Sequence, residues 1–226
     1  LTDDDTPTAG EIVLPSGGEF VFPFTQFTSN SAGFCTVDAT KWCTWDGRVS
    51  QRATSWTTNL KPAVVNMFWL VNAFHQHLAA APISFTGFTG AADRIQAHGL
   101  DGASSGPDAN HLDNANMSTL PAGRGARMQM YLATTVPGYQ QRDVDYDFDP
   151  ATVWHEYTHG LSNRLITDAD GYGALDAQQS GSMGEGWSDW YALDAMVDTP
   201  AGYPDRTRDR RHRDARRGQP RRVHRP

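Results

Sequence analysis

The stretch DPATVWHEYTH, residues 149–159, decides the fold of this chain. Asp149 is a typical N-cap residue and Pro150 suits the first helical position, so a helix is predicted to begin here. His155 and His159 are four residues apart, which places both on one helical face with Cβ atoms ~5 to 6 Å apart. That separation allows two imidazoles to bind the same zinc ion.

Glu156 directly follows the first of these histidines on a helix that we expect to end near Asn163. Its side chain is rotated by about 100° from that of His155, so it can face the open coordination position of a metal without being a ligand. A general base that accepts a proton from zinc-activated water must lie there. The chain has only four Glu, so a chance HExxH motif is rare.

Glu185, in the segment GEGWSD, follows His159 by 26 residues. This spacing leaves room for a loop and a second helix that returns antiparallel to the first. Glu185 would then complete a His, His, Glu ligand set and leave the fourth position to water, as in catalytic zinc sites. Asp189, four residues further on the same face, can accept the second ring N–H of a zinc-bound histidine. The competing interpretation is an acidic helix start that interacts only with the helix dipole.

The composition, with 38% apolar and 20% charged residues, is typical of one compact domain or two small ones. No apolar run reaches the ~18 residues of a membrane helix. The first residues, LTDDDTPT, lack the pattern of a secretory signal. We therefore expect no membrane segment, and we interpret the opening Leu as a sign of a processed product or a fragment.

The net charge of −7 hides two regions of opposite charge. Residues 204–226 contain ten Arg and three Asp, a net of +7, so the first 203 residues contain 9 Lys or Arg and 23 Asp or Glu, a net of −14. Val223 is the only aliphatic residue larger than Ala in this tail, so we expect no fold there. Nucleic-acid binding through the tail is a competing function, although the tail lacks interleaved aromatic residues.

Hydrophobic periodicity predicts two further helices and a strand. A helix follows Pro62, with a buried stripe at Val64, Met67, Val71, Phe74 and Leu78. His75 and His77 on this helix point ~200° apart, so we expect packing or surface roles for them rather than a shared metal. Residues 127–133 predict a strand. The last helix is expected over residues 184–197, with Trp190, Leu193, Met196 and Val197 as its apolar side.

Two further features leave alternatives open. Cys35 and Cys43 are separated by seven residues, which favours a small disulfide loop over a metal site, with two buried free thiols as the alternative.

The acidic run before the zinc helix consists of Asp143, Asp145, Asp147 and Asp149. Pro150 stands where an EF-hand loop requires Gly, so that motif is excluded. A solvated turn that caps the zinc helix is the favoured interpretation, and another type of calcium site using one or two of these Asp is the alternative.

Four stretches carry a resemblance to a known family: HEYTHGLSNRL, GSMGEGWSDW, NANMSTLPAGRGARMQMY and RDVDYDFDPATVWHEYTHG. They resemble the fungalysin (M36, elastinolytic) family of secreted zinc metalloendopeptidases, which shares the gluzincin plan with thermolysin. The resemblance runs from about Ala63 to about Ala195. It implies one zinc ion held by His155, His159 and Glu185, with Glu156 as the catalytic base. It also implies that Asn114 and Ala115 form the edge segment along which a substrate backbone lies.

The resemblance further implies an α+β fold: the N-terminal catalytic lobe of a thermolysin-like zincin, with a mixed β-sheet, an HExxH helix and a glutamate-ligand helix. We expect a β-rich segment over residues 1–60, an incomplete catalytic lobe over 61–200 and an Arg-rich, disordered tail over 201–226. The expected protein is an extracellular monomer that cleaves internal peptide bonds of proteins and binds neither a membrane nor a specific nucleic acid.

The C-terminal part departs from the family. Related enzymes continue with a helical lobe that supplies a His or Tyr to the oxyanion, whereas this chain has 41 residues beyond Glu185. We expect that lobe to be absent and attribute the Arg-rich tail to a shifted reading frame. Tyr172 is the one replacement candidate. A zinc-binding but catalytically inactive fragment is therefore the main alternative function.

Overall fold

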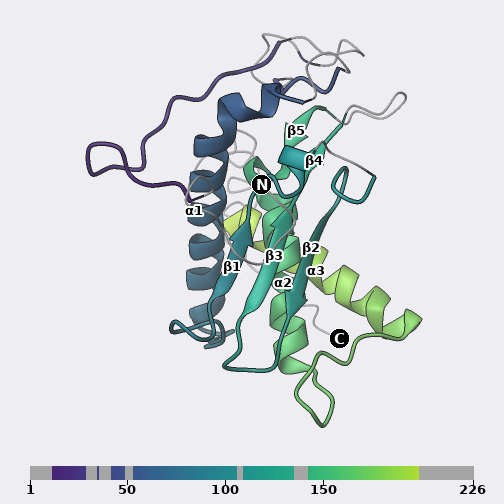
Figure 1. The fold of residues 1–226 in the computed structure, drawn as a ribbon. Helices are drawn as coiled ribbons and strands as arrows, with labels where there is room; N and C mark the ends of the chain where they lie inside the picture. The colour runs from purple at the N-terminus through teal and green to yellow at the C-terminus, as the bar shows by residue number, and fades with distance from the viewer. Residues whose placement is uncertain are drawn as a thin grey trace, which may run out of the picture.

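The structure, a computed structural model, describes residues 12–28, 35, 42–48, 53–105, 109–134 and 142–198. These residues form the predicted α+β fold, in which helices pack beside a small mixed sheet (Figure 1). The helices are α1 (Leu60–Ala79), α2 (Pro150–Leu165) and α3 (Gln178–Asp198), with short 3-10 helices η1 (Ser55–Asn59), η2 (Ala103–Ser105) and η3 (Tyr146–Phe148).

The central sheet has the strand order β1-β3-β2. Strand β1 (Ile95–His98) runs parallel to β3 (Ala126–Met130), and β2 (Ala115–Thr119) pairs antiparallel with β3. A second, two-stranded sheet joins β4 (Leu132–Ala133) to β5 (Val144–Asp145). The β structure predicted over residues 127–133 is confirmed, but it is divided into two strands because the chain changes sheets at Tyr131. Within the described residues, β2 is an edge of its sheet.

Helix α1 confirms the predicted helix after Pro62 and begins two residues before it. Its buried residues are Ala63, Met67, Leu70, Phe74 and Leu78. The predicted stripe is slightly rotated, since Val64 and Val71 are only partly buried. His75 Nδ1 lies 2.8 Å from the Tyr157 hydroxyl, and the His77 ring stacks on Phe74. Both histidines thus have the predicted packing roles.

Aromatic residues hold α2 in the core. The Trp154 ring stacks on Phe74, with ring centroids 5.5 Å apart, and its indole N–H donates to the Leu70 carbonyl at 3.0 Å. Tyr157 contacts Phe74 and Phe88 edge to face, at 5.3 and 5.7 Å. These rings anchor the side of α2 that carries no histidine, so the opposite side is presented in a defined orientation.

Helix α3 differs from the predicted helix in its first residue and in the side that is buried. It begins at Gln178, six residues before the predicted Gly184. Trp190 and Leu193, predicted to be buried, are each 58% exposed. The buried positions of α3 are instead small: Gly184, Ser188, Ala192 and Ala195. This small-residue face packs against α2, and of the predicted apolar side Met196 packs against the core while Trp190, Leu193 and Val197 are exposed. The hydrophobic pattern therefore predicted most of the buried side wrongly.

The described part of the N-terminal segment contains less β-structure than predicted. In the described part of residues 1–60, the strands expected around Pro15 are replaced by a turn with one bridge, Ser16–Glu19, and a second isolated bridge joins Phe27 to Cys43. Cys35 and Cys43 form a disulfide, the first of the two alternatives that the sequence left open. The Arg-rich tail, on which the nucleic-acid hypothesis depends, lies outside the described residues.

None of the helices in the described ranges combines the length and the apolar character that crossing a membrane requires.

Candidate metal centre

Helix α2 begins as its sequence predicts. Asp149 is the N-cap, and its carboxylate accepts hydrogen bonds from the Ala151 backbone N–H at 3.0 Å and from the Thr152 hydroxyl at 2.8 Å. Pro150 occupies the first turn, where no intrahelical donor is needed. The helix ends at Leu165, two residues beyond the predicted end. This start sets the register of His155 and His159, which follow Pro150 by about 1.4 and 2.5 turns.

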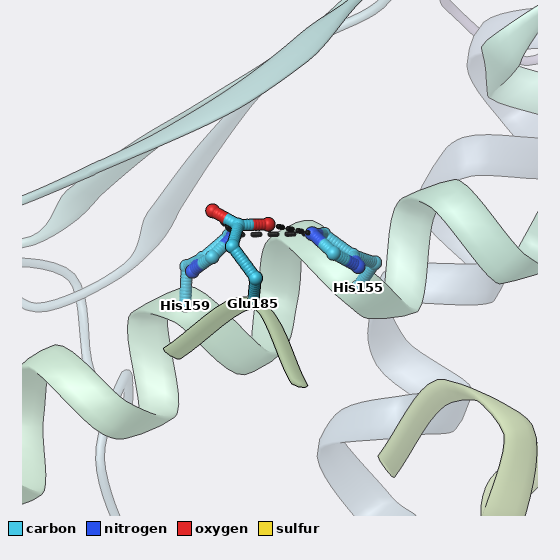
Figure 2. A group of neighbouring side chains, drawn as sticks. All are labelled: His155, His159 and Glu185. Atoms are coloured by element: carbon cyan, nitrogen blue, oxygen red, sulfur yellow. Dashed lines mark hydrogen bonds and ion pairs between the residues drawn. The ribbon is translucent and has the colours of Figure 1, made fainter. Parts of the chain in front are cut away.

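Three donor side chains from α2 and α3 converge at one point (Figure 2). His155 Nε2 lies 3.1 Å from His159 Nε2 and 3.1 Å from Glu185 Oε2. His159 Nε2 lies 3.5 Å from Glu185 Oε1. Among the described residues, these three form the one group of at least three His, Cys, Asp or Glu side chains whose ligand atoms lie within 4.8 Å of one another.

The donor set fits zinc in both spacing and chemistry. Tetrahedral zinc with bonds of about 2.0 to 2.2 Å requires ligand atoms roughly 3.3 to 3.5 Å apart, close to the distances observed. Two imidazole nitrogens with one carboxylate oxygen is a zinc-preferring combination. Burial lowers the pKa of His159, which favours the neutral imidazole that can bind a metal. The set leaves one tetrahedral position open.

Asp189 lies where the helical spacing predicted. Its Oδ1 accepts a hydrogen bond from His155 Nδ1 at 2.8 Å. This contact favours the tautomer in which Nδ1 carries the proton and Nε2 presents its lone pair to the centre. Because Asp189 is one turn after Glu185 on α3, one helix supplies both carboxylates to the same histidine.

Glu156 lies beside the three donors but is not one of them. Its side chain is buried, and burial raises its pKa to about 7, with the neighbouring His155 acting in the opposite direction and Glu185 adding to the rise. A carboxylate in such a site has a pKa suited to exchange protons near neutral pH. The structure thus places Glu156 in the same cavity as the donors, and its role as the base stays a prediction.

A cavity of about 460 Å³ is lined by the three donors, Glu156 and the first residues of the edge strand β2. Asn114 and Ala115 line it, so the structure brings the expected substrate-binding segment beside the donors. Helix α2 packs closely on β2 at Gly160, where a Cβ would lie 2.6 Å from Met117 Cε. The full lining is Asn114, Ala115, Asn116, Met117, His155, Glu156, His159, Asn163, Leu175, Asp176, Gly181, Gly184 and Glu185.

Sequence reasoning missed two polar residues of this cavity, Asn163 and Asp176. Helical spacing could have predicted Asn163, since it lies four residues after His159 on the same helical face. Asp176 lies in the loop before α3, and no sequence pattern indicated it. Tyr172, the replacement candidate for the oxyanion donor, is not part of the cavity lining. Its hydroxyl instead accepts a hydrogen bond from Arg124 at 3.3 Å.

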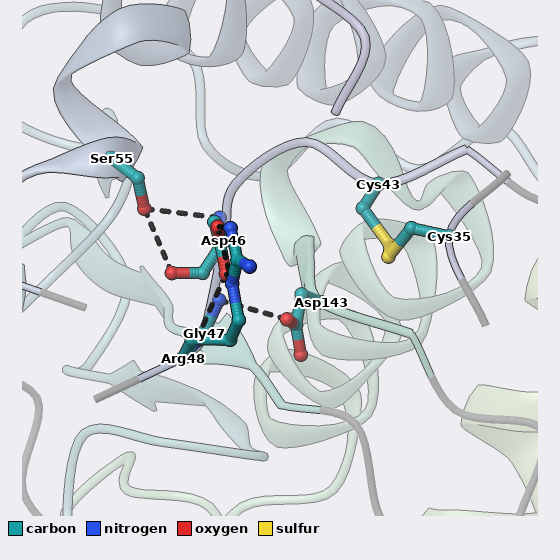
Figure 3. Close-up of polar contacts among 7 residues, drawn as sticks. All are labelled: Cys35, Cys43, Asp46, Gly47, Arg48, Ser55 and Asp143. Atoms are coloured by element: carbon teal, nitrogen blue, oxygen red, sulfur yellow. Dashed lines mark hydrogen bonds and ion pairs between the residues drawn. A yellow bond between two sulfur atoms is a disulfide. The ribbon is translucent and has the colours of Figure 1, made fainter. Parts of the chain in front are cut away.

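The acidic run before α2 is not the solvated turn that the sequence favoured. Asp149 caps the helix, but Asp143, Asp145 and Asp147 are buried. Asp143 accepts a hydrogen bond from the Gly47 N–H at 2.8 Å in the polar cluster of Figure 3. These carboxyls were misassigned because the segments that cover them are distant in sequence. Residues 44–47 contact Asp143 and Asp145, and Gly99 lies against Asp147.

Burial strongly perturbs two of these carboxyls. Burial raises the pKa of Asp145 to about 7, and burial together with the charge of Asp145 raises the pKa of Asp147 well above its usual range. Among the residues that the structure describes, Asp145 Oδ2 and both carboxyl oxygens of Asp147 have no hydrogen-bond partner. The calcium alternative at this run stays a prediction.

Comparisons with known proteins agree with the resemblance in the motifs. The family model of the fungalysin metallopeptidases (M36) matches residues 23–211. The chain is 34% identical over 157 residues to "Extracellular metalloproteinase MEP" of Pyricularia oryzae, which covers 63% of the chain. It is 36% identical over 137 residues to "Extracellular metalloproteinase 2" of Phaeosphaeria nodorum and 37% identical over 141 residues to "Extracellular metalloproteinase mep" of Aspergillus niger. The matched stretch spans only 20 to 23% of the length of these relatives.

Proposed function

The chain belongs to the fungalysin metallopeptidase family, M36, and from this premise we propose that it is an extracellular zinc endopeptidase that hydrolyses internal peptide bonds of proteins. The observation that carries the proposal is the convergence of His155, His159 and Glu185 in one cavity with Glu156. The extracellular assignment is supported by the names of the relatives.

In the proposed mechanism His155, His159 and Glu185 hold the metal. A zinc ion supplies Lewis-acid chemistry there, polarising the scissile carbonyl and acidifying water. The Asp189 carboxylate keeps the His155 ring oriented and its Nε2 unprotonated. Zinc binding is therefore a joint property of α2 and α3, because neither helix alone contains three donors.

Glu156 acts as the general base and then as the general acid. Its carboxylate accepts the proton of the attacking water and afterwards delivers it to the nitrogen of the departing amine. Burial raises the pKa of this carboxyl to about 7 in the absence of a metal, and the charge of a bound zinc ion would lower it, which favours the ionised form that accepts the proton.

Strand β2 binds the substrate backbone. It is an edge strand whose first residues line the cavity, so an extended peptide can pair with it and place a peptide bond beside the donors. Asn114, just before β2, contributes side-chain amide donors at the cavity wall. The backbone pairing is independent of side chains, so it suits the broad sequence range of an endopeptidase.

The test combines metal content with turnover. The protein, freed of metal and then supplied with one equivalent of Zn²⁺, is expected to cleave internal bonds of unfolded casein, and dialysis against a chelator is expected to stop cleavage reversibly. Zinc bound at one equivalent without turnover would favour the zinc-binding, inactive alternative. Cleavage that survives complete zinc removal would contradict the proposal.

A further inference from the structure

The outer face of the central sheet, on the side away from the helical core, contains a groove of about 350 Å³. Arg127 of β3 lies there between its register partners Gln96 of β1 and Ser118 of β2. Arg94, just before β1, and Arg124, in the β2–β3 hairpin, complete its wall. We call the site formed by Arg94, Arg124 and Arg127 the arginine groove.

The arginine groove is a local region of positive charge. Among the described residues that line it there is no Asp or Glu. The neighbouring Asp93 is already engaged, with its Oδ1 2.6 Å from the Arg164 guanidinium and accepting from the Gly123 N–H at 3.0 Å. Within the described ranges, neither Arg94 nor Arg124 forms an ion pair with a carboxylate. The guanidinium groups of Arg94 and Arg124 therefore give the groove a potential that attracts anions.

Strand β2 connects the arginine groove to the metal centre. Its first residues, Ala115 to Met117, line the cavity of the zinc donors, whereas Ser118 and Leu120 line the arginine groove. At ~3.4 Å per residue, Ala115 and Ser118 are about 10 Å apart along the strand. A peptide that pairs with β2 at the metal centre therefore reaches the groove after about three further residues.

The pleat of β2 determines which side chain of such a peptide enters the groove. Residues that are directly opposite on paired strands present their side chains to the same face of the sheet. The peptide residue opposite Ser118 thus has its side chain on the face that carries Arg127. The small Ser118 side chain leaves space above the strand for a longer side chain to reach the guanidinium groups.

We propose that the arginine groove binds an acidic side chain of the peptide substrate, about three to five residues from the scissile bond. The inference rests on the proposed endopeptidase function and adds a preference to it: protein segments with Asp or Glu at this distance on one side of the cleaved bond are selected. Guanidinium groups bind carboxylates through paired N–H donors, so a Glu is distinguished from the isosteric Gln.

The test uses quenched fluorescent peptides that differ only by Glu or Gln at one position, three to five residues before or after the scissile bond. One Glu position is expected to raise kcat/KM about 3- to 10-fold, the range of one or two exposed ion pairs. The rise should shrink at high salt. It should disappear in the double variant Arg94→Gln, Arg124→Gln, whereas the control Lys61→Gln, which removes an exposed positive charge on α1, should retain it.

A binding measurement separates this proposal from the proposed activity. The same peptides are titrated into the Glu156→Gln protein supplied with zinc, where no turnover is needed. Tighter binding of the Glu peptide, lost in the double arginine variant, supports the groove even if the unmodified protein shows no cleavage, an outcome that would contradict the activity alone. Equal binding of Glu and Gln peptides, no binding of either, or an undiminished Glu preference in the double variant would overturn the groove.

Discussion

The two helices that meet at the metal centre, α2 and α3, are built on different principles. Helix α2 fills its interior side with large side chains such as Trp154 and Tyr157, which bury most of their surface. Helix α3 approaches α2 with small residues such as Ala192 and Ala195, while Trp190 and Leu193 face outward. The large residues of α2 set its position in the core, and the small residues of α3 allow the short distance over which Glu185 reaches both histidines.

Glu156→Gln tests the chemical role of α2 and should have the largest effect. Because Gln cannot accept a proton from water, proteolysis should fall by about 10² to 10⁴. Zinc content should remain near one per chain, since Glu156 is not a donor of the metal group. Parallel measurement of zinc and peptide hydrolysis distinguishes the two properties. Loss of zinc in this variant would mean that Glu156 is a ligand.

Asp189→Asn tests the hydrogen bond that α3 provides to His155. The amide cannot replace the carboxylate that accepts from His155 Nδ1, so zinc affinity should fall ~10- to 100-fold without being abolished. Competition with a chromophoric chelator measures the change. An Asp194→Asn variant on the same helix is the matched control, and an equal loss of affinity there would contradict a specific role for Asp189.

Ala192→Leu tests the close approach of the two helices. Three additional carbons at a position that is 2% exposed should force α3 away from α2 and lower the free energy of unfolding by about 1 to 3 kcal/mol. The control is Leu193→Ala on the neighbouring exposed position, which should change it by no more than about 0.5 kcal/mol. Denaturant unfolding of both variants measures these values. A larger cost for the Leu193 variant would reverse the assignment of the two faces.

The buried carboxyls before α2 predict a pH dependence of stability. Burial raises the pKa of Asp145 from 3.8 to about 7, so between these values the folded state binds more protons than the unfolded state. The free energy of unfolding contributed by this group is therefore highest near pH 4 and decreases as the pH rises to about 7. The raised pKa of Asp147 acts in the same direction.

The double variant Asp145→Asn, Asp147→Asn isolates this effect, because its amides do not titrate. In metal-free buffer, the stability of the unmodified protein relative to the variant should be lower at pH 8 than at pH 5, as measured by urea unfolding. The same difference at both pH values would contradict the assignment. Recovery at pH 8 on addition of millimolar calcium would favour the calcium alternative.

The sequence predicted the features that depend on residues close to one another in the chain. The Asp149 cap, the Pro150 start and the i, i+4 histidines are local features, and all three agree with the structure. These predictions hold because the relevant residues lie within a few turns of one another. The i, i+4 spacing of Glu185 and Asp189 is local too, but the hydrogen bond between Asp189 and His155 joins two helices across 34 residues and depended on the prediction that the second helix returns to the first.

Long-range packing explains what the sequence could not predict. The buried state of Asp145 and Asp147 depends on segments that are up to a hundred residues away, such as Thr44, whose hydroxyl accepts from the Asp145 N–H at 2.7 Å. The face of α3 was mispredicted because apolar periodicity assigns large residues to the core, whereas the close contact with α2 requires small ones. The cavity role of Asp176 likewise depends on how its loop folds back.

Zinc stoichiometry tests the central claim most directly. Metal analysis of the purified protein, after zinc loading and removal of excess metal, should give about one zinc per chain. The double variant His155→Ala, His159→Ala should give about none, because only Glu185 of the three donors would remain. One retained zinc per chain in that variant would contradict the assignment of the metal centre to α2 and α3.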